Sequence, residues 1–222
     1  MKKAIKEKSA DRHQRIYKCI RERICLLHYP PGSQLNETEL AAEFNVSRTP
    51  MRRVVQKLSH EGLLETKNGV GTIVTDINMK SFKDIYALRM LLADAMGRLS
   101  PNPVSSRHIE IISDLIERAE AIQLKRDVEA YARIANDLED LLIDLIGSDP
   151  LKEITDMLYY RVSRIWFTFL PNLDWESVIS DQLIEMNQMR DALKRDDIQA
   201  VGEIRSLHFR GILKKISHYM SK

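Results

Sequence analysis

Residues 35–74 constrain the fold of this chain more than any other segment, because two short helical patterns are followed at once by a glycine-rich pair of extended patterns. The first helix is expected to begin after Asn36, which with Glu39 resembles a capping box, and to end near Asn45. Its apolar stripe consists of Leu40, Ala41 and Phe44. The sequence therefore predicts a short amphipathic helix that packs one face on a small core.

A second helix is expected after a tight turn. Ser47 is a favourable capping residue, and Pro50 is tolerated in the first turn because the amides there have no partner within the helix. The apolar stripe of this helix consists of Val54, Val55 and Leu58. Its other faces carry Arg48, Thr49, Arg52, Arg53 and Gln56. Arginine can pair with a guanine edge through two hydrogen bonds, and threonine can contact a thymine methyl group, so this pattern indicates a helix that enters the major groove of DNA.

Two short strands are expected after Gly62, which ends the second helix. The strands are predicted at residues 63–66 and 72–74, and the turn between them at residues 67–71. Lys67 and Asn68 lie at the tip beside Gly69, so the backbone there can approach a phosphate or the minor groove closely. An Asn-Gly turn alone indicates only a hairpin, but its position directly after a basic helix favours the wing of a winged helix-turn-helix, a DNA-reading fold.

Residues 12–74 resemble the N-terminal domain of the GntR family of bacterial transcription regulators. The resemblance is carried by the continuous motif PPGSQLNETELAAEFNVSRTPMRRVVQKLSHEGLLET and by the wing glycine. It implies that DNA is contacted from the recognition helix by Ser47, Arg48, Thr49 and Arg52, and from the wing by Gly69.

Two residues depart from the pattern of that family. Thr38 stands where many relatives have a basic residue that contacts the DNA backbone, and Arg53 replaces a common glutamate after Arg52. The first change is expected to weaken a phosphate contact, whereas the second adds a positive charge that is expected to alter this contact or the operator preference. Together with Asn68 at the wing tip, Thr38 and Arg53 complete the predicted DNA-binding set.

Charge is distributed unevenly along the chain. The 222 residues have a net charge of +2, but residues 1–76 contain 14 Lys and Arg against 9 Asp and Glu, a net charge of +5. A positive bias of this kind is the electrostatic footprint of a phosphate-binding half, although an ordinary solvated surface can also carry it. We therefore expect a DNA-binding domain over residues 1–76 and a second domain over residues 77–222.

Cysteine spacing and apolar runs bear on the cellular location. Cys19 and Cys25 lie six residues apart in a predicted helix over residues 12–28, a spacing that suits neither a metal pair nor a disulfide framework. The apolar stripe of that helix consists of Ile16, Ile20, Ile24 and Leu27. The sequence has no apolar run near the ~18 residues of a membrane span, and its start lacks the apolar core of a secretion signal. A cytoplasmic location without a membrane partner is expected.

After residue 81 the apolar spacing predicts six amphipathic helices joined by short links, and no strand. The helices are expected at residues 82–99, 105–125, 128–146, 151–169, 175–195 and 198–219. Such an arrangement favours an antiparallel bundle. The predicted fold class of the whole chain is mainly α, with an N-terminal winged helix-turn-helix and a C-terminal antiparallel six-helix bundle.

Three stretches of the helical region resemble the effector domain called FCD: DIYALRMLL, the stretch that ends in GSDPL, and DALKRDDIQAVGEIRSLHF. The number of helices resembles the VanR-like subgroup. Members of this family typically hold a divalent metal with an acidic or amide residue and a histidine four apart on the third helix, and with one histidine on each of the fifth and sixth helices. Residues four apart share a helix face, so they can converge on one ion.

This chain departs from that ligand pattern. Two alignments of the third helix remain open: one places Ala135 and Glu139 at the ligand positions, and the other, shifted by one residue, places Asn136 and Asp140 there. Met186 occupies the place of the histidine on the fifth helix, and only His208 on the sixth helix matches. A thioether is a poor ligand for hard or borderline divalent ions. We therefore expect no metal and no other cofactor.

The arginines of the helical domain suit an anionic ligand. Arg89 corresponds to an arginine in the first effector helix of the family, and the fourth helix adds Tyr160, Arg161, Arg164 and Trp166. An arginine on an amphipathic helix is more commonly part of a solvated face, and a single histidine is more commonly a hydrogen-bonded core residue. The predicted effector-binding set is Arg89, Glu139, Arg161, Met186 and His208, and the expected ligand is an organic acid.

The leading hypothesis from the sequence is a ligand-responsive repressor that binds a palindromic double-stranded DNA operator as a homodimer. A single winged helix reads only a few base pairs, whereas two of them match a two-fold operator. In the alternative hypothesis the helical domain of the DNA-binding dimer senses no ligand and serves only dimerisation or partner contact. Catalytic residues are not expected, because the sequence contains no nucleophile elbow, phosphate-cradling loop or zinc-protease pair.

Overall fold

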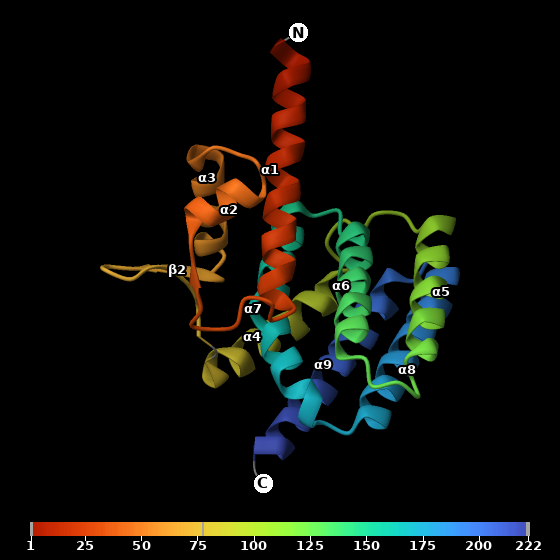
Figure 1. The fold of residues 1–222 in the computed structure, drawn as a ribbon. Helices are drawn as coiled ribbons and strands as arrows, with labels where there is room; N and C mark the ends of the chain where they lie inside the picture. Colours follow the sequence, from red (N-terminus) through yellow and green to blue (C-terminus); the bar gives the residue numbers. More distant parts are fainter. Residues whose placement is uncertain (1, 77, 221–222) are drawn as a thin grey trace. The chain divides into compact units, whose positions relative to one another are not determined.

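A computed structural model describes residues 2–76 and 78–220, with side chains described over residues 11–76 and 78–219. The chain divides into two compact units, Met1–Asn78 and Met79–Lys222. Figure 1 traces the first unit from red to yellow and the second from yellow to blue. Each unit buries its own set of apolar side chains.

Three helices form most of the first unit: α1 (Lys2–Cys25), α2 (Glu37–Glu43) and α3 (Arg48–His60). Both α1 and α2 pack against α3, which buries Met51, Val54, Val55 and Leu58. The end of α1 differs from the expectation at residue 28, because Leu27 adopts a left-handed backbone with φ 62° that cannot continue a helix. Leu27 is consequently only half-buried, and the buried stripe of α1 ends with Ile24.

A three-stranded antiparallel sheet completes the first unit. Its strands are β1 (Gln34–Leu35), β2 (Leu64–Lys67) and β3 (Gly71–Val74), in the order β1-β3-β2. Lys67 pairs with Gly71 next to the turn of the β2–β3 hairpin, which extends away from α2 and α3 in Figure 1. The predicted wing is therefore confirmed. The sequence did not predict β1, because two residues are too few to show the alternation of a strand.

The second unit is helical. Within residues 79–220 the structure describes α4 (Met79–Ala95), α5 (Ser106–Ala121), α6 (Val128–Leu145), α7 (Asp149–Phe169), the short 3-10 helix η1 (Leu170–Asn172), α8 (Trp175–Lys194) and α9 (Ile198–Met220). All six predicted helices are confirmed, with ends that differ from the expected ones by a few residues. The predicted fold class, a winged helix-turn-helix followed by a helical bundle, is therefore correct.

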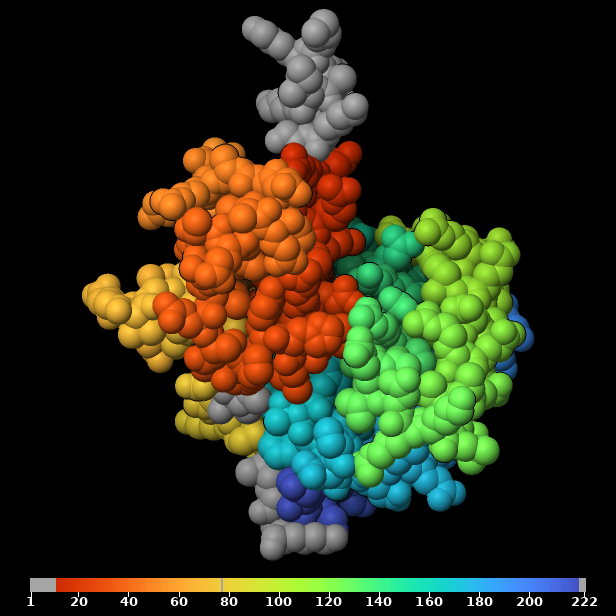
Figure 2. Space-filling view, viewed as in Figure 1, coloured from red at the N-terminus to blue at the C-terminus, as the bar shows by residue number. Residues whose placement is uncertain are grey.

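Helix packing in the second unit centres on α9, which lies against α4 and α8. The α5 helix packs on α6 and α8, and Figure 2 shows the side chains of α5 and α6 meeting on the visible face of this unit. The backbones of α4 and α9 approach each other closely at Gly202, where a Cβ atom would lie 2.1 Å from the carbonyl oxygen of Ala93. Glycine thus allows α9 to lie almost directly on α4.

None of the helices within residues 2–76 and 78–220 is long and apolar enough to cross a membrane. Cys19 is half-buried and Cys25 is buried, and both are free thiols.

Candidate nucleic-acid interface and ligand site

The start of α3 is capped differently from the expectation. Ser47 occupies the N-cap position with an extended backbone (φ −74°, ψ 166°), but its hydroxyl accepts no hydrogen bond from the α3 amides that the structure describes. Asn36, by contrast, caps α2: its Oδ1 accepts from the amides of Thr38 at 2.9 Å and Glu39 at 3.3 Å. Its Nδ2 also donates to the Glu39 carboxylate at 2.8 Å. The Ser47 hydroxyl therefore remains available to a partner outside the protein.

All members of the predicted DNA-binding set are exposed: Thr38, Ser47, Arg48, Thr49, Arg52, Arg53, Asn68 and Gly69. Five of these residues lie on α3 or at its cap, one lies in the first turn of α2, and two lie at the tip of the wing. Because the apolar stripe of α3 faces the core, its polar face can enter a groove without disturbing the fold.

The arginines on α3 differ from other cations of the first unit. Arg48, Arg52 and Arg53 make no hydrogen bond or ion pair with any residue that the structure describes. Arg12, in contrast, donates to the carbonyl oxygen of Phe44 at 2.9 Å. Arg23 is 2.6 Å from the Glu43 carboxylate, and Lys57 lies 3.7 Å from the ring centroid of Tyr17. The exposed face of α3 thus concentrates guanidinium groups that need not break an internal contact to bind phosphate or a base edge.

The tip of the wing is a tight turn between β2 and β3. Gly69 has φ 77°, in the left-handed region, and the amide of Val70 donates to the carbonyl oxygen of Lys67 at 3.1 Å. A Cβ atom at Gly69 would meet no described heavy atom within 4 Å, so the backbone conformation and not crowding favours glycine there. The side chain of Gln34 donates to the Val70 carbonyl oxygen and supports the turn, while Asn68 is exposed.

In the second unit, the inward face of α6 is now defined. Glu139 is only 2 % exposed, whereas its neighbour Asp140 is exposed. Both carboxylate oxygens of Glu139 accept hydrogen bonds from Nη2 of Arg89, each at 3.0 Å. Arg89 on α4 is 3 % exposed. Of the two acidic residues that the sequence left open, Glu139 therefore faces the interior.

Arg205 on α9 extends this ion pair across the bundle. Its Nη2 lies 2.8 Å from Glu139 Oε2, and its Nη1 lies 2.9 Å from Oε1 of Glu185 on α8. The second carboxylate oxygen of Glu185 is 3.3 Å from Nδ1 of His208 on α9. We call these five residues, Arg89, Glu139, Arg205, Glu185 and His208, the charge ladder. It links α4, α6, α8 and α9 through side chains that are nearly all removed from water.

Burial and neighbouring charges shift the pKa values in the charge ladder. Burial alone would lower the pKa of Arg205, but the carboxylates of Glu185 and Glu139 outweigh this effect and raise it, so the guanidinium stays charged. Burial lowers the pKa of His208, with Glu185 opposing, so the imidazole is neutral at neutral pH. Nδ1 of the neutral ring faces the carboxylate of Glu185 at 3.3 Å.

Aromatic rings surround the Arg89 end of the charge ladder. The guanidinium carbon of Arg89 lies 4.3 Å from the ring centroid of Phe209, 5.1 Å from that of Tyr159 and 5.6 Å from that of Tyr86. Burial raises the pKa of Tyr86 to about 12, so its phenol stays neutral. These rings provide cation–π attraction in a site from which water is excluded.

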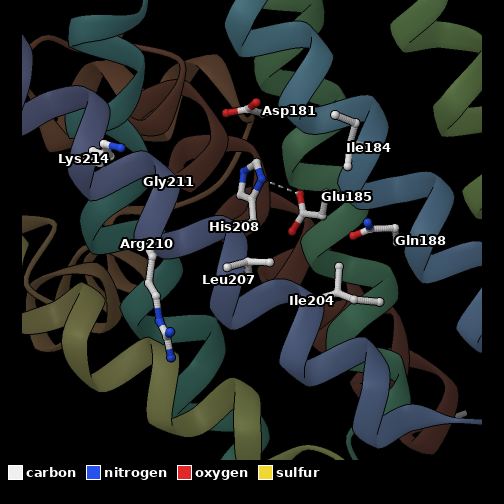
Figure 3. A pocket seen from close by; sticks show the side chains of 10 residues that line it. All are labelled: Asp181, Ile184, Glu185, Gln188, Ile204, Leu207, His208, Arg210, Gly211 and Lys214. Atoms are coloured by element: carbon white, nitrogen blue, oxygen red, sulfur yellow. Dashed lines mark ion pairs between the residues drawn. The ribbon is translucent and has the colours of Figure 1, made fainter.

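A pocket of about 330 Å³ opens between α8 and α9 at the other end of the charge ladder. Its lining includes Asp181, Ile184, Glu185, Leu207 and His208. Figure 3 shows the imidazole of His208 facing Glu185 and Asp181, with its 3.3 Å contact to Glu185 drawn as a dashed line. The charge ladder therefore runs from the core to a pocket that solvent can enter.

The predicted effector-binding residues lie in different places. Arg89 and Glu139 bind each other in the core, and His208 lies in the pocket wall. Met186 is completely buried on α8. Arg161 is half-buried on α7 and makes no hydrogen bond or ion pair within residues 11–76 and 78–219.

Two members of the charge ladder, Glu185 and Arg205, were missed by the sequence reasoning. A usable signal was present, because each is a charged residue at a position that helical spacing assigns to the buried face. Glu185 lies between the buried Gln182 and Met189, and Arg205 lies one turn after the buried Val201. A charge on the core face of a helix indicates a buried partner.

Family models match both units. A model described as bacterial regulatory proteins of the gntR family matches residues 12–74, and a model of the FCD domain matches residues 84–211, more than half of the chain. The chain belongs to the GntR family. It is accordingly a DNA-binding transcription regulator, as the sequence predicted.

The chain is similar to an Nta operon transcriptional regulator of Aminobacter aminovorans. The two sequences are 28 % identical over 78 % of this chain and 80 % of the relative.

Further similarities support this membership. The transcriptional repressor RspR of Escherichia coli is 22 % identical over 92 % of this chain and 88 % of its own length. Among solved structures, McbR/YncC of E. coli has a TM-score of 0.77 at 15 % identity, covering 94 % of this chain and 98 % of that one. A GntR regulator from Rhodococcus sp. RHA1 has a TM-score of 0.68 at 18 % identity, covering 93 % and 98 %. These two likenesses establish the shared fold.

The metal that the FCD resemblance implies does not fit the residues of this GntR-family chain. All four carboxylate oxygens of Glu139 and Glu185 already accept hydrogen bonds from cationic or polar side chains. The Oε2 atom of Glu185 accepts from Gln182 at 3.1 Å. Within the part of the chain that the structure describes, no group of three or more His, Cys, Asp or Glu side chains is placed to hold an ion.

The two capping residues of the winged unit are expected to respond oppositely to alanine. Ser47→Ala leaves the melting temperature unchanged, because the hydroxyl makes no cap bond within the described chain, but weakens DNA binding. Asn36→Ala removes a complete cap and lowers the free energy of unfolding by about 1 kcal/mol. Thermal melts and fluorescence anisotropy with operator DNA measure both effects. A loss of stability in Ser47→Ala would show that the hydroxyl serves the fold.

Proposed function

We propose that this GntR-family regulator is a cytoplasmic, ligand-responsive repressor that binds a palindromic operator as a homodimer. The observation that carries the proposal is the exposed start of α3, where Arg48, Arg52 and Arg53 have no internal partner among the described residues. Guanidinium groups that are already free can meet guanine edges and phosphates at little internal cost. The protein has no catalytic role in this proposal.

The proposal assigns different contacts to the parts of the winged unit. Arg48 and Arg52 pair with base edges in the major groove, because they lie in the first turns of α3 and lead into the groove. Contacts to the DNA backbone come from Thr38, Ser47, Thr49 and Arg53. The wing tip, with Asn68 and Gly69, approaches the minor groove or its phosphates.

Dimerisation follows from what one winged unit can read. One recognition helix covers only a few base pairs, which is too few for operator specificity in a genome. Two units related by a two-fold axis present two recognition helices to successive major grooves, about one helical turn apart. A palindromic operator is the DNA counterpart of this symmetry.

The helical unit is proposed to bind a small organic acid. The pocket between α8 and α9 combines the cations Arg210 and Lys214 with the apolar side chains of Ile184 and Leu207, which suits an anion with an apolar body. Its wall contains His208, the last member of the charge ladder. The first member, Arg89, lies on α4, which follows the wing in the chain. A ligand that favours one arrangement of the ladder therefore favours one arrangement of α4.

Named relatives support repression. RspR of E. coli is a transcriptional repressor, and a relative from Paenarthrobacter nicotinovorans, 23 % identical over 85 % of this chain and 81 % of its own length, is described as a probable D-xylose utilization operon transcriptional repressor. By analogy, this chain would block transcription when it binds its operator, and a ligand that weakens operator binding would relieve the block.

The test begins with selection of binding sites from random duplexes by the full chain. We expect an inverted repeat, two chains per duplex in sedimentation, and an affinity at least about 10³-fold above that for a scrambled duplex at physiological salt. Equal affinity for the two duplexes would refute sequence-specific binding, and a selected site without two-fold symmetry would refute the homodimer. Titration of the bound complex with carboxylic and sugar acids then tests release by ligand.

One observation favours a second candidate function, a DNA-binding dimer that senses no ligand. Arg89, the arginine expected to hold an anionic ligand, instead donates through Nη2 to the internal carboxylate of Glu139. In that case the helical unit serves dimerisation or partner contact only. Thermal-shift screening against organic acids separates the candidates, because a specific ligand raises the melting temperature of the domain that binds it.

A further inference from the structure

The charge ladder contains a cation at its centre. The Arg205 guanidinium lies between two buried carboxylates, 2.8 Å from Glu139 and 2.9 Å from Glu185. Glu139 and His208 are two of the residues that the family pattern assigns to a metal site, and both belong to this ladder. We propose that the Arg205 guanidinium is a built-in cation that takes the place of the metal, so that the effector unit folds and responds to ligand without a metal ion.

Charge balance supports this assignment. Arg89 and Arg205 provide two positive charges, and Glu139 and Glu185 provide two negative charges, so the buried part of the ladder is neutral with His208 uncharged. A divalent ion added beside Arg205 would leave a large positive excess in a site of low dielectric constant. The chain therefore excludes a metal by charge as well as by ligand type.

Geometry supports the same conclusion. A guanidinium donates in a fixed planar fork, and Arg205 uses two of its nitrogens to bridge carboxylates from α6 and α8. A metal at the centre of a bundle performs the same task, because it draws ligands from several helices to one point. The ion would need lone pairs on Glu139 and Glu185 that now accept from Arg89, Arg205 and Gln182.

The proposal implies a latent cation site beneath Arg205. Removal of this side chain leaves the carboxylates of Glu139 and Glu185 on either side of one vacated position. Carboxylate oxygens bind divalent first-row ions, and affinity rises along the series from manganese to nickel. In Arg205→Ala a small cation from solution can therefore restore what the guanidinium provided.

The experiment measures the melting temperature of the full chain. Arg205→Ala is expected to melt on the order of 10 °C lower, because two buried carboxylates lose their shared cation. Methylguanidinium or Ni²⁺ at millimolar concentration is expected to recover at least half of that loss, with no effect on the unmodified protein. Arg107→Ala, which removes an exposed arginine of α5, should melt normally. Adding Glu185→Gln to Arg205→Ala should abolish recovery by Ni²⁺.

Several outcomes would overturn the proposal. Unchanged stability of Arg205→Ala, or a loss that neither cation restores, would show that Arg205 is not the cation that holds the carboxylates. Arg205→Met, which keeps most of the volume, must also be destabilised; a normal melting temperature would mean that only packing matters. If neither variant folds, elemental analysis of the purified unmodified chain decides. Stoichiometric zinc, nickel or manganese in that chain would contradict a built-in cation. A lower melting temperature in EDTA would contradict it as well. None of these results bears on operator binding.

Discussion

Replacing Arg52 with alanine is expected to lower the affinity for the operator by about 30-fold to 10⁴-fold, because each arginine that pairs with a guanine edge contributes about 1–3 kcal/mol and a dimer loses two of them. Arg52 is exposed on α3 and has no partner within the described residues, so the variant should keep its melting temperature. Fluorescence anisotropy with the selected operator, at fixed salt, measures the loss.

Arg107→Ala is the matched control for Arg52→Ala. It removes the same charge from an exposed position, but on α5 of the helical unit. If Arg52 acted only through net charge, both variants would weaken binding to operator and to scrambled DNA alike. We expect Arg52→Ala to reduce mainly the preference for the operator and Arg107→Ala to leave it unchanged. An Arg52→Ala variant with normal preference would remove this residue from the reading face.

The winged unit was predictable because its information is local. Caps, apolar stripes and turn glycines each act over a few residues, so the positions of α2, α3 and the wing followed from the sequence. Local patterns were insufficient for β1, which exists only through its pairing with β3. The role of Ser47 was also misjudged, because a residue type suited to capping does not ensure that the bond forms.

The ligand site was harder to predict because it is built from distant segments. Helical spacing placed Arg89, Glu139 and His208 on their helices, but not the bonds that join them. Those bonds span 50 residues from Arg89 to Glu139 and 66 from Glu139 to Arg205. The family resemblance marks the metal positions. Arg205, the residue that replaces the ion in our proposal, is not one of these positions.

The helix contact that allows the charge ladder to form can be tested at Gly202. Arg89 on α4 and Arg205 on α9 both reach Glu139, which requires these two helices to lie close together. At Gly202 a Cβ atom would lie 2.1 Å from the carbonyl oxygen of Ala93, a backbone atom that cannot rotate away. Gly202→Ala must therefore push α4 and α9 apart, and we expect the melting temperature to fall by about 5–10 °C.

Gly211→Ala provides the control within the same helix. Its nearest neighbour would be Asp181 Oδ2 at 4.0 Å, an ordinary contact, so alanine there adds only helix propensity of up to about 1 kcal/mol and the melting temperature should stay equal or rise. Both variants add one methyl group to α9, but only Gly202→Ala is expected to separate α9 from α4. Equal melting temperatures of the two variants would show that the helices are free to adjust.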